Sequence, residues 1–382
     1  MKKRKNWNNR AVARAWFTFL SWQPLSLRPN TMTILKMSAP SIFALAVIWF
    51  GSCQAHSVGT SNRASPGYSP AQQIVGTIRI WGPGGEEKTF IESLLISWEE
   101  AFRRYEPGIR FENRLVGDAS GIGGLYTGAA DLALMTREIL PTEIDGYEQA
   151  LGHKPSRVVI ATGSLDAPHH EPALVIFVHK DNPVSKLTLR QVDAIFGADH
   201  RRGSRAIRTW GDVGLTAEWT GKPIHPYGYG LRSDIAHFFE QTALAGSEKW
   251  SCELREVGNQ PTDAHGIDAG QLILEALGND RYGIAVSSLA YMHAGVKPLL
   301  LAEGEGGKYY PASPETVSHR QYPLARTASI YFDRSPGKPV DPKIKEFLNY
   351  VLGEEGQKAL SHETRYFPLT PELAEDARGA LQ

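Results

Sequence analysis

The most constraining feature of this sequence is a recurring unit of apolar strand, glycine-rich break and amphipathic helix. Ile74–Trp81 alternates as a strand does and stops at Gly82–Gly85, and Thr89–Tyr105 then places apolar residues along one helical face. A second strand, Ile109–Val116, breaks at Gly117–Gly121 and leads into another helix. This alternation is typical of an α/β protein built on a parallel sheet.

The rest of the chain continues the same pattern. Apolar runs predict five further strands, and capping residues followed by apolar faces predict four further helices. The strands are expected at Asp131–Met135, Leu174–His179, Ile224–Tyr229, Tyr282–Ser288 and Ala328–Phe332. The helices are expected to begin at Thr188, Ser233, Asp268 and Asp341.

The first 55 residues are set apart by their charge. They carry eight of the 41 Lys and Arg residues and no acid, which leaves 33 basic against 41 acidic residues in the rest of the chain. An acidic body disfavours non-specific binding of nucleic acid, so no nucleic-acid partner is expected. The basic stretch leads into apolar Ala39–Phe50 and then small residues at Gly51–Ala55, which is the pattern of an export signal.

Residues 1–55 are therefore expected to form an export signal, and residues 56–73, rich in Ser, Gly and Pro, a flexible linker. The segment ending at Cys53 resembles a lipoprotein processing box, which would make that cysteine a lipidated anchor. Ordinary cleavage after Cys53-Gln54-Ala55 and an uncut amino-terminal anchor stay open as alternatives. The only other cysteine, Cys252, is expected to be a small buried residue.

The sequence has no strong catalytic motif: it lacks G-x-S-x-G, a P-loop, H-E-x-x-H and paired C-x-x-C motifs. Asp166–Glu171 contains His169 and His170, but adjacent histidines point opposite ways on an extended chain. That stretch is expected to be a solvated loop, and no metal or cofactor site is predicted. A hydrolase that uses Asp118 and His237 is the enzyme alternative, although no motif pairs a nucleophile with a base.

Three junctions between a loop and a helix are more informative: Gly82–Glu87, Gly117–Gly121 and Gly230–Asp234. In an open α/β sheet, ligands bind beyond the carboxyl ends of the strands, where the positive ends of helices converge. The junctions therefore favour a small polar or anionic ligand. The alternative is three ordinary glycine-containing turns.

Several short motifs form a more specific set. They are Gly128–Arg137, Asp181–Pro183, Leu187–Leu189, Tyr322–Arg326 (YPLAR), Pro336–Pro342 (PGKPVDP), Glu355–Gln357 (EGQ) and Pro368–Pro371 (PLTP). Together they resemble the PstS-like periplasmic phosphate-binding proteins of ABC transporters, over most of the chain from Ile74 to Pro371. In that family the EGQ motif ends a helix.

The resemblance implies a periplasmic-binding-protein-like fold of type II, with two α/β lobes, two crossover strands and a ligand cleft. Leu174–His179 and Arg326–Phe332 would be the crossovers. Residues 74–174 plus 325–375 would form lobe one, and residues 175–324 lobe two. The resemblance also implies hinge closure on the ligand, docking on an ABC permease of the inner membrane, a periplasmic location and no enzymatic activity. A monomer is expected.

The resemblance further implies that phosphate, or another small oxyanion, is held without a metal. Backbone amides and Ser or Thr hydroxyls donate to it, an arginine pairs with it and an aspartate accepts its proton. The candidate ligand-binding residues are Gly84, Gly85, Asp118, Ser120, Thr136, Arg137, Arg232 and Ser233.

The three loops depart from the family pattern. The first has no hydroxyl residue, and Asp118 replaces a serine in the second. In the third, Tyr229 stands at the arginine position, and Asp234-Ile235 replace Gly-Thr beside Ser233. Ser233 and Asp234 also suit an N-cap and a first-turn acid. Arg137 and Arg232 are the nearby charges that could replace the arginine. A diverged paralogue that holds another polar solute, or serves as a sensor or assembly partner, therefore stays open.

Overall fold

The computed structural model describes residues 67–85, 87–168, 170–258 and 268–382. The predicted export signal, including Cys53, lies outside these residues, as do residues 56–66 of the predicted linker and His169. The described residues all belong to one compact unit of the chain. No helix among them is long and apolar enough to cross a membrane.

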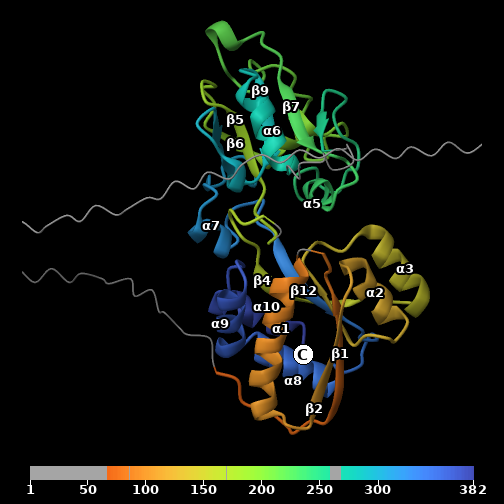
Figure 1. Cartoon of the computed structure of the whole chain (residues 1–382). Helices are drawn as coiled ribbons and strands as arrows, with labels where there is room; N and C mark the ends of the chain where they lie inside the picture. Colours follow the sequence, from red (N-terminus) through yellow and green to blue (C-terminus); the bar gives the residue numbers. More distant parts are fainter. Residues whose placement is uncertain (1–66, 86, 169, 259–267) are drawn as a thin grey trace, which may run out of the picture. The chain divides into compact units, whose positions relative to one another are not determined.

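The first sheet has five strands in the order β2-β1-β3-β12-β4 (Figure 1). They are β1 (Gly76–Gly82), β2 (Ile109–Leu115), β3 (Leu132–Met135), β4 (Ser156–Thr162) and β12 (Thr327–Phe332). β1 pairs in parallel with β2 and β3, whereas β12 runs antiparallel to β3 and β4. The predicted parallel α/β unit is confirmed for the first three strands, and the late strand β12 makes the sheet mixed.

Helices cover both faces of the first sheet (Figure 1). One face carries α1 (Glu87–Tyr105), α8 (Pro342–Val351), α9 (Glu354–Glu363) and α10 (Pro371–Gly379); the other carries α2 (Asp118–Tyr126) and α3 (Pro141–Leu151). Successive residues of β3 show why. Leu132 and Leu134 pack into the first layer, and Ala133 and Met135 into the second, because strand side chains alternate between faces.

The EGQ motif corrects one expectation, because it lies in the first turn of α9 and not at the end of α8. A side chain at Gly356 would collide with the carbonyl of Tyr350, so glycine allows the close approach of the two helices. The Gly356 carbonyl accepts a hydrogen bond from Trp98 Nε1 at 2.8 Å. Gln357 Nε2 donates to the carbonyl of Ile160 at 3.0 Å. The motif therefore ties α9 to α1 and to the sheet.

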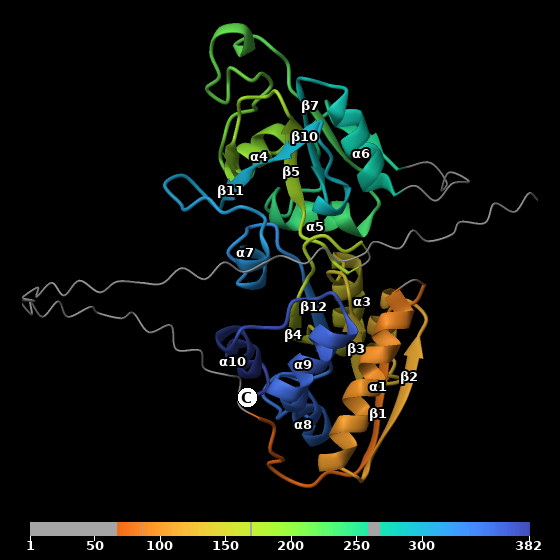
Figure 2. The same cartoon turned by 60° about the vertical axis from the view of Figure 1, so that its left-hand side comes forward.

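The second sheet has the order β10-β5-β9-β7-β8. Its strands are β5 (Val175–His179), β7 (His225–Tyr229), β8 (Arg255–Val257), β9 (Gly283–Ser287) and β10 (Val296–Pro298). β7 is parallel to β8 and β9, and β5 is antiparallel to β9 and β10. β6 (Lys186–Thr188) and β11 (Leu300–Ala302) form a separate parallel pair. The helices of this region are α4 (Leu189–Phe196), α5 (Asp234–Thr242), α6 (Ala269–Gly278) and the short α7 (Pro314–Ser318) (Figure 2).

The predicted helix starts are confirmed by their caps. Thr188 and Gln191 form the capping box of α4, in which the backbone N–H of Gln191 donates to Thr188 Oγ1 at 3.2 Å. Ser233 caps α5, Asp268 caps α6 and Asp341 caps α8. Each such cap contributes roughly 1 kcal/mol to helix stability.

Two local environments differ from the sequence-based expectations. Cys252 is exposed, so its assignment as a buried residue was wrong; it lies in a turn before β8. Tyr68, in the stretch expected to be a flexible linker, packs edge-on against Tyr350, and its hydroxyl donates to Glu346 at 2.9 Å. An aromatic ring with a buried acceptor holds this part of the stretch against α8.

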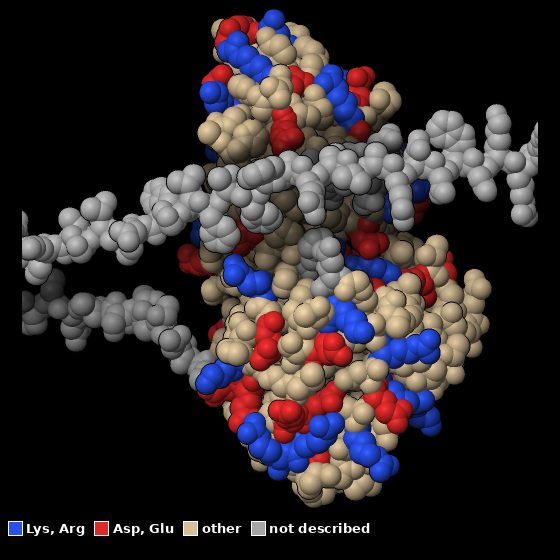
Figure 3. All heavy atoms as spheres, viewed as in Figure 1, with Lys and Arg blue, Asp and Glu red and all other residues tan. Residues whose placement is uncertain are grey.

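Charges of both signs are mixed on the surface of the described residues. On the face seen in Figure 3, Lys and Arg side chains alternate with Asp and Glu side chains. Where the described residues are visible in that view, they show no continuous basic stripe of the kind that a nucleic-acid backbone requires.

Candidate functional site

The topology gathers polar loops at one edge of each sheet. The parallel strands β1, β2 and β3 end at the same edge, and the antiparallel strand β12 begins there, which brings Arg326 to it. In the second sheet, β7, β8 and β9 end at one edge, where β5 begins. Ligands of open α/β sheets bind beyond such carboxyl ends.

Residues from these two edges line one pocket of about 290 Å³. We call the first edge Glu87, Asp118, Thr136, Arg137, Glu171 and Arg326, and the second edge Tyr229, Ser233, Asp234, Asp268, Ser288 and Tyr291. All of them except Thr136 line the pocket, together with Pro168, Pro172 and Ile235. Five carboxylates and two arginines therefore face the same space.

Within the first edge, Thr136 is buried behind the residues that line the pocket, and its donors are occupied. Its backbone N–H donates to Asp118 Oδ1 at 3.0 Å, and its hydroxyl donates to Glu87 Oε2 at 2.7 Å. The carboxylates of Asp118 and Glu87 thus stand between Thr136 and the pocket. An oxyanion could reach these donors only by displacing a carboxylate.

Asp118 is the first residue of α2, and its environment favours the protonated acid. The pKa of Asp118 is raised to about 7, mainly because the carboxyl group is buried and also because Glu87 and Asp234 lie near it. The hydrogen bond from the Thr136 N–H and the Arg137 guanidinium oppose this rise. Near neutral pH this carboxyl group is therefore able to gain or lose a proton.

Arg137 is almost fully buried and is already paired. Its two terminal nitrogens form a bidentate ion pair with Glu143, with N–O distances of 2.9 and 2.6 Å. Its Nε lies 3.6 Å from Asp234 Oδ2 of the second edge. Because the fork is held by Glu143, Arg137 presents a fixed guanidinium edge to the pocket.

Arg326 is the second buried cation of the site and is 2 % exposed. It donates to Glu138 Oε2 at 2.7 Å and contacts the carboxylate of Glu171. Burial lowers the pKa of Arg326, but Glu138 and Glu171 raise it by more, so the net direction is upward. Burial also raises the pKa of Glu171, and the Arg326 charge opposes this. The buried pair is a fixed part of the pocket wall.

The second edge offers short polar side chains at helix starts. Ser233 Oγ accepts the N–H of Ala236 at 3.1 Å, and Ser288 Oγ accepts the N–H of Ala290 at 3.2 Å. Each hydroxyl uses a lone pair in this way and keeps its own proton as a donor. Asp268 accepts the N–H of Gly270 at 2.7 Å and the hydroxyl of Tyr291.

The structure brings together part of the predicted site. Asp118, Arg137 and Ser233 line the pocket, and Thr136 lies behind Asp118. The lining does not include Gly84, Gly85, Ser120 or Arg232. A Cβ on Gly84 would lie 2.8 Å from the Val116 carbonyl carbon, so that glycine packs the first loop on the second. The Ser120 hydroxyl donates to the Gly117 carbonyl at 2.6 Å, and Arg232 is exposed.

Eight polar pocket residues are absent from the predicted site: Glu87, Glu171, Tyr229, Asp234, Asp268, Ser288, Tyr291 and Arg326. Ser288 directly follows β9 and caps the helical turn after it, and Asp268 caps α6; both are signals that sequence alone carried. Glu171 overturns the expectation of a solvated loop, because it is buried and paired with Arg326. His237 of the hydrolase alternative does not line the pocket, and its Nδ1 lies 3.6 Å from Glu240 Oε2.

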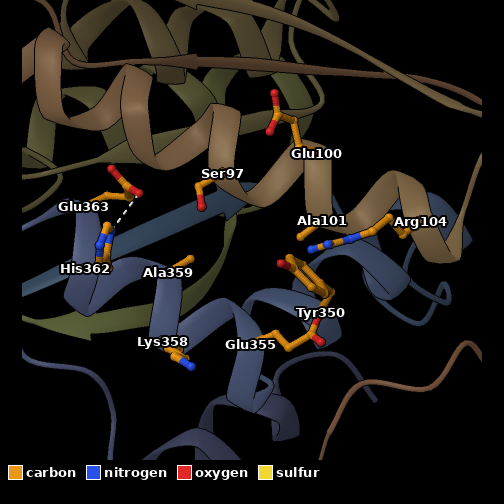
Figure 4. Close-up of a pocket in the computed structure, with 10 residues that line it drawn as sticks. All are labelled: Ser97, Glu100, Ala101, Arg104, Tyr350, Glu355, Lys358, Ala359, His362 and Glu363. Carbon is orange, nitrogen blue, oxygen red and sulfur yellow. Dashed lines mark hydrogen bonds and ion pairs between the residues drawn. The ribbon is translucent and has the colours of Figure 1, made fainter.

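A larger hollow of about 620 Å³ lies between α1 and α9, away from both edges (Figure 4). Figure 4 shows Arg104 of α1 reaching towards Tyr350, and Lys358 and His362 along α9. His362 Nδ1 pairs with its neighbour Glu363 at 3.0 Å. No strand-end loop contributes to this hollow, so its residues have none of the convergence expected of a ligand site.

Two mixed sheets, each with helices at the carboxyl ends of its parallel strands and a shared polar pocket, define a solute-binding protein of the periplasmic-binding type. Residues 85–355 match the family model described as the PBP superfamily domain. The chain is 31 % identical over 335 residues to the phosphate-binding protein PstS of Pseudomonas aeruginosa, covering 87 % of this chain and 96 % of that protein.

Two more distant similarities are consistent with this match. Protein SphX of Synechococcus elongatus is 23 % identical over 273 residues, which cover 71 % of this chain and 72 % of SphX. The crystal structure of PstS from Borrelia burgdorferi aligns with a TM-score of 0.50 at 14 % identity, over 77 % of this chain and 98 % of that one, and so supports the fold alone. The chain belongs to the PstS-like family of the PBP superfamily.

Proposed function

We propose that this protein is the extracytoplasmic solute-binding component of an ABC-type phosphate uptake system. The pocket lined by Asp118, Arg137 and Ser233 would hold phosphate or a related small oxyanion. The observation that carries this proposal is that the Arg137 guanidinium and the Ser233-capped start of α5 face the same pocket. A cation and a helix amino terminus both favour an anion.

Several further features support the proposal. The relative with 31 % identity is a phosphate-binding protein, and its match runs through both sheets. Residues 74–174 plus 325–375 would form one lobe around the first sheet, and residues 175–324 the other lobe around the second. Closure of the lobes on the ligand would then create the form that docks on a permease. The chemistry is binding, with no enzymatic step and no resident metal or cofactor.

Calorimetric titration of the mature protein with phosphate near neutral pH tests this function. We expect micromolar or tighter binding and an increase in the melting temperature that grows with phosphate concentration. Glu100→Gln, on the exposed side of α1, should bind as the parent does. Absence of both heat and thermal shift would contradict the proposal.

We also propose that the protein is exported to the periplasm, acts as a monomer and has no nucleic-acid partner. Lipidation of Cys53 would anchor it to the membrane. Fractionation of cells that express Cys53→Ser tests the anchor: the variant should move from the membrane to the soluble fraction. An unchanged membrane fraction would contradict lipidation, and sedimentation of the mature protein tests the monomer.

One observation favours a second candidate function, a diverged binding protein for another polar solute. Five carboxylates line the pocket, and both of its arginines are already paired. Such a wall suits a cationic solute that donates hydrogen bonds. Thermal-shift measurements with small amines beside phosphate distinguish the two, because stabilisation by an amine alone would favour this candidate.

A further inference from the structure

Another pocket lies beside the segment that leads from α7 into β12. Its volume is about 380 Å³, within the range of roughly 300–1,000 Å³ that is usual for small-molecule sites. None of the described residues that line it also lines the pocket between the two edges. Its charged lining residues are Glu303, Lys308 and Arg320. The surroundings of the two cations determine which ligand this pocket suits.

Arg320 occupies a backbone position that glycine usually takes. It is the second residue after α7, and its φ of 54° lies in the left-handed region. Its N–H donates to the Val317 carbonyl at 2.9 Å, and the Gln321 N–H donates to the Thr316 carbonyl at 2.8 Å. These two bonds form a Schellman motif, which favours glycine because a Cβ is unfavourable at positive φ. An arginine at this position therefore lowers the stability of the folded chain.

The guanidinium of Arg320 is a second source of instability, because it is partly buried without a carboxylate partner. Its Nε donates to Thr162 Oγ1 at 3.3 Å, and its Nη2 is buried and has no hydrogen-bond partner among the described residues. The same residues place no carboxylate within ion-pair distance of it. The pKa of Arg320 is lowered to about 10, mainly by burial and also by the nearby charge of Arg157, while Asp376 opposes the shift. Burying a charge that has no partner is costly.

Lys308 adds an exposed cation to the same pocket. Its Nζ lies 5.0 Å from the ring centroid of Tyr310, and within the described parts of the chain it forms no ion pair. The carboxylate of Glu303 pairs with an arginine that does not line the pocket, since its Oε1 lies 3.4 Å from Arg202 Nη1. The two lining cations are therefore largely uncompensated, and an anion in the pocket would offset their charge.

Much of the remaining lining is ring and aliphatic carbon, from Tyr310, Tyr322, Pro323 and Ala325. Such a wall suits the hydrocarbon part of an organic acid, whereas inorganic phosphate has no apolar part to place against it. The Glu303 carboxylate in the same lining repels a doubly charged anion more strongly than a singly charged one. The pocket thus favours one carboxylate on an apolar body.

We propose that this pocket binds a small monocarboxylate with an apolar body, whose carboxylate pairs with Arg320 and Lys308. The site goes beyond the proposed phosphate-binding function and does not depend on it. Residues that lower stability are typical of functional positions, and Arg320 does so through both its backbone and its charge. The bound carboxylate supplies the counter-charge that the described residues do not.

Thermal unfolding of the mature protein in sodium benzoate tests the site, with sodium chloride at equal ionic strength as the reference. We expect the melting temperature to rise with benzoate concentration above its value in chloride. Arg320→Gln should weaken the apparent affinity for benzoate about tenfold or more, because a hydrogen bond to a charged group is lost. Lys308→Gln should weaken it about threefold, because that cation is exposed.

The matched control is Arg110→Gln, which removes an exposed arginine of β2 and should keep the parent's response to benzoate. Acetate, which lacks the apolar body, should stabilise the parent less than benzoate does. Equal stabilisation by the two acids would overturn the preference for an apolar body. Loss of the benzoate response in Arg320→Gln, with the response retained in Arg110→Gln, supports the site.

The ligand-free variants separate binding from folding. Arg320→Gln should melt at the parent's temperature or above it, because it removes an uncompensated charge while its amide NH₂ can still donate to Thr162. A clearly lower melting temperature would show that the arginine stabilises the fold, and would overturn the argument for a ligand. Lys308→Gln changes an exposed side chain, so its response to benzoate tests the site even if Arg320→Gln does not fold.

Titration with inorganic phosphate separates this test from that of the proposed function. Arg320→Gln and Lys308→Gln should bind phosphate as the parent does, since neither residue lines the pocket between the edges. A parent that benzoate does not stabilise, or a benzoate response that is unchanged in both variants, overturns the inference and leaves the proposed function standing.

Discussion

The two edges of the pocket occupy equivalent positions, each at the carboxyl ends of its sheet's parallel strands, but their polar groups are paired differently. The first edge is a network of buried charges whose donors are satisfied before any ligand arrives, as the pairs of Arg137 with Glu143 and Arg326 with Glu138 show. The second edge consists of helix caps such as Ser233 and Ser288, whose hydroxyl protons remain available.

The difference shows that the fold alone does not determine whether the donors of a loop bind a ligand or are satisfied within the protein. The first edge has the expected position beyond β1, β2 and β3, yet its carboxylates satisfy the donors of Thr136 internally. Mutations there should therefore change stability and proton affinity first. Mutations at the second edge should change ligand affinity first.

Arg326→Ala should have the largest effect on the fold. It leaves the buried Glu171 and the partly buried Glu138 without their cation, and removing one partner of a buried pair typically costs about 3–5 kcal/mol. Urea unfolding of the ligand-free protein measures this loss. Arg79→Ala is the control: its pair with Asp131 is partly exposed, so the expected loss is about 1 kcal/mol or less. Equal losses in the two variants would contradict a special role for the buried pair.

Asp118→Asn should stabilise the ligand-free protein at high pH. The folded-state pKa of Asp118 is raised from its ordinary 3.8 to about 7, so folded protein holds a proton that unfolded protein releases between these values. Parental stability therefore falls as pH rises from about 4 to 7, and the uncharged amide avoids this loss. Each unit of such a shift corresponds to about 1.4 kcal/mol. Unfolding at pH 4.5 and pH 8 should show a gain only at pH 8; an equal gain at both would contradict the titration.

Ser233→Ala should weaken phosphate binding about tenfold, since a donor to an anion contributes on the order of 1.5 kcal/mol. It should also cost about 1 kcal/mol of stability, because Ser233 caps α5. Thr370→Ala separates the two effects: Thr370 caps α10 by accepting the Leu373 N–H, away from the pocket. This control should lose similar stability and retain the parent's affinity. An unchanged phosphate affinity in Ser233→Ala would show that the serine does not take part in binding the ligand.

Asp234→Asn should have the smallest effect. Its carboxylate is 56 % exposed and lies 3.6 Å from Arg137 Nε, so its pair contributes less than about 0.5 kcal/mol to stability. Removing this negative charge from the pocket should raise phosphate affinity about threefold, because one carboxylate fewer then opposes the attraction of Arg137 and the start of α5 for the anion. Titration calorimetry at pH 7.5 measures the change, and a clear loss of affinity would show that Asp234 helps to hold the ligand.

Much of the fold could be predicted from the sequence because the signals for its helices and strands are local. Strand alternation and the caps Thr188, Ser233, Asp268 and Asp341 gave most of the central elements. The missed α9 has Gly353 at its N-cap without a side-chain bond and Gly356 in its first turn, and both weaken a local helix signal. Its glycine is explained only by contact with Tyr350 of the preceding helix.

Less of the site could be predicted, because half of it depends on pairs of residues that are far apart in the sequence. Asp118, Arg137 and Ser233 lie in the short loops just after strand ends, and strand ends can be found in a sequence. Glu171 and Arg326 lie 155 residues apart and meet only because β12 runs antiparallel into the first sheet. Nothing local distinguishes Glu171 from the solvated acid it was expected to be.

The central claim is that one oxyanion contacts both edges, and a crystal structure of the protein grown with phosphate tests it most directly. We predict tetrahedral density in the pocket, with one oxygen within hydrogen-bond distance of Ser233 Oγ and another within hydrogen-bond distance of the Asp118 carboxyl group. Density confined to another location, such as the hollow between α1 and α9, or an empty pocket at saturating phosphate, would contradict the account.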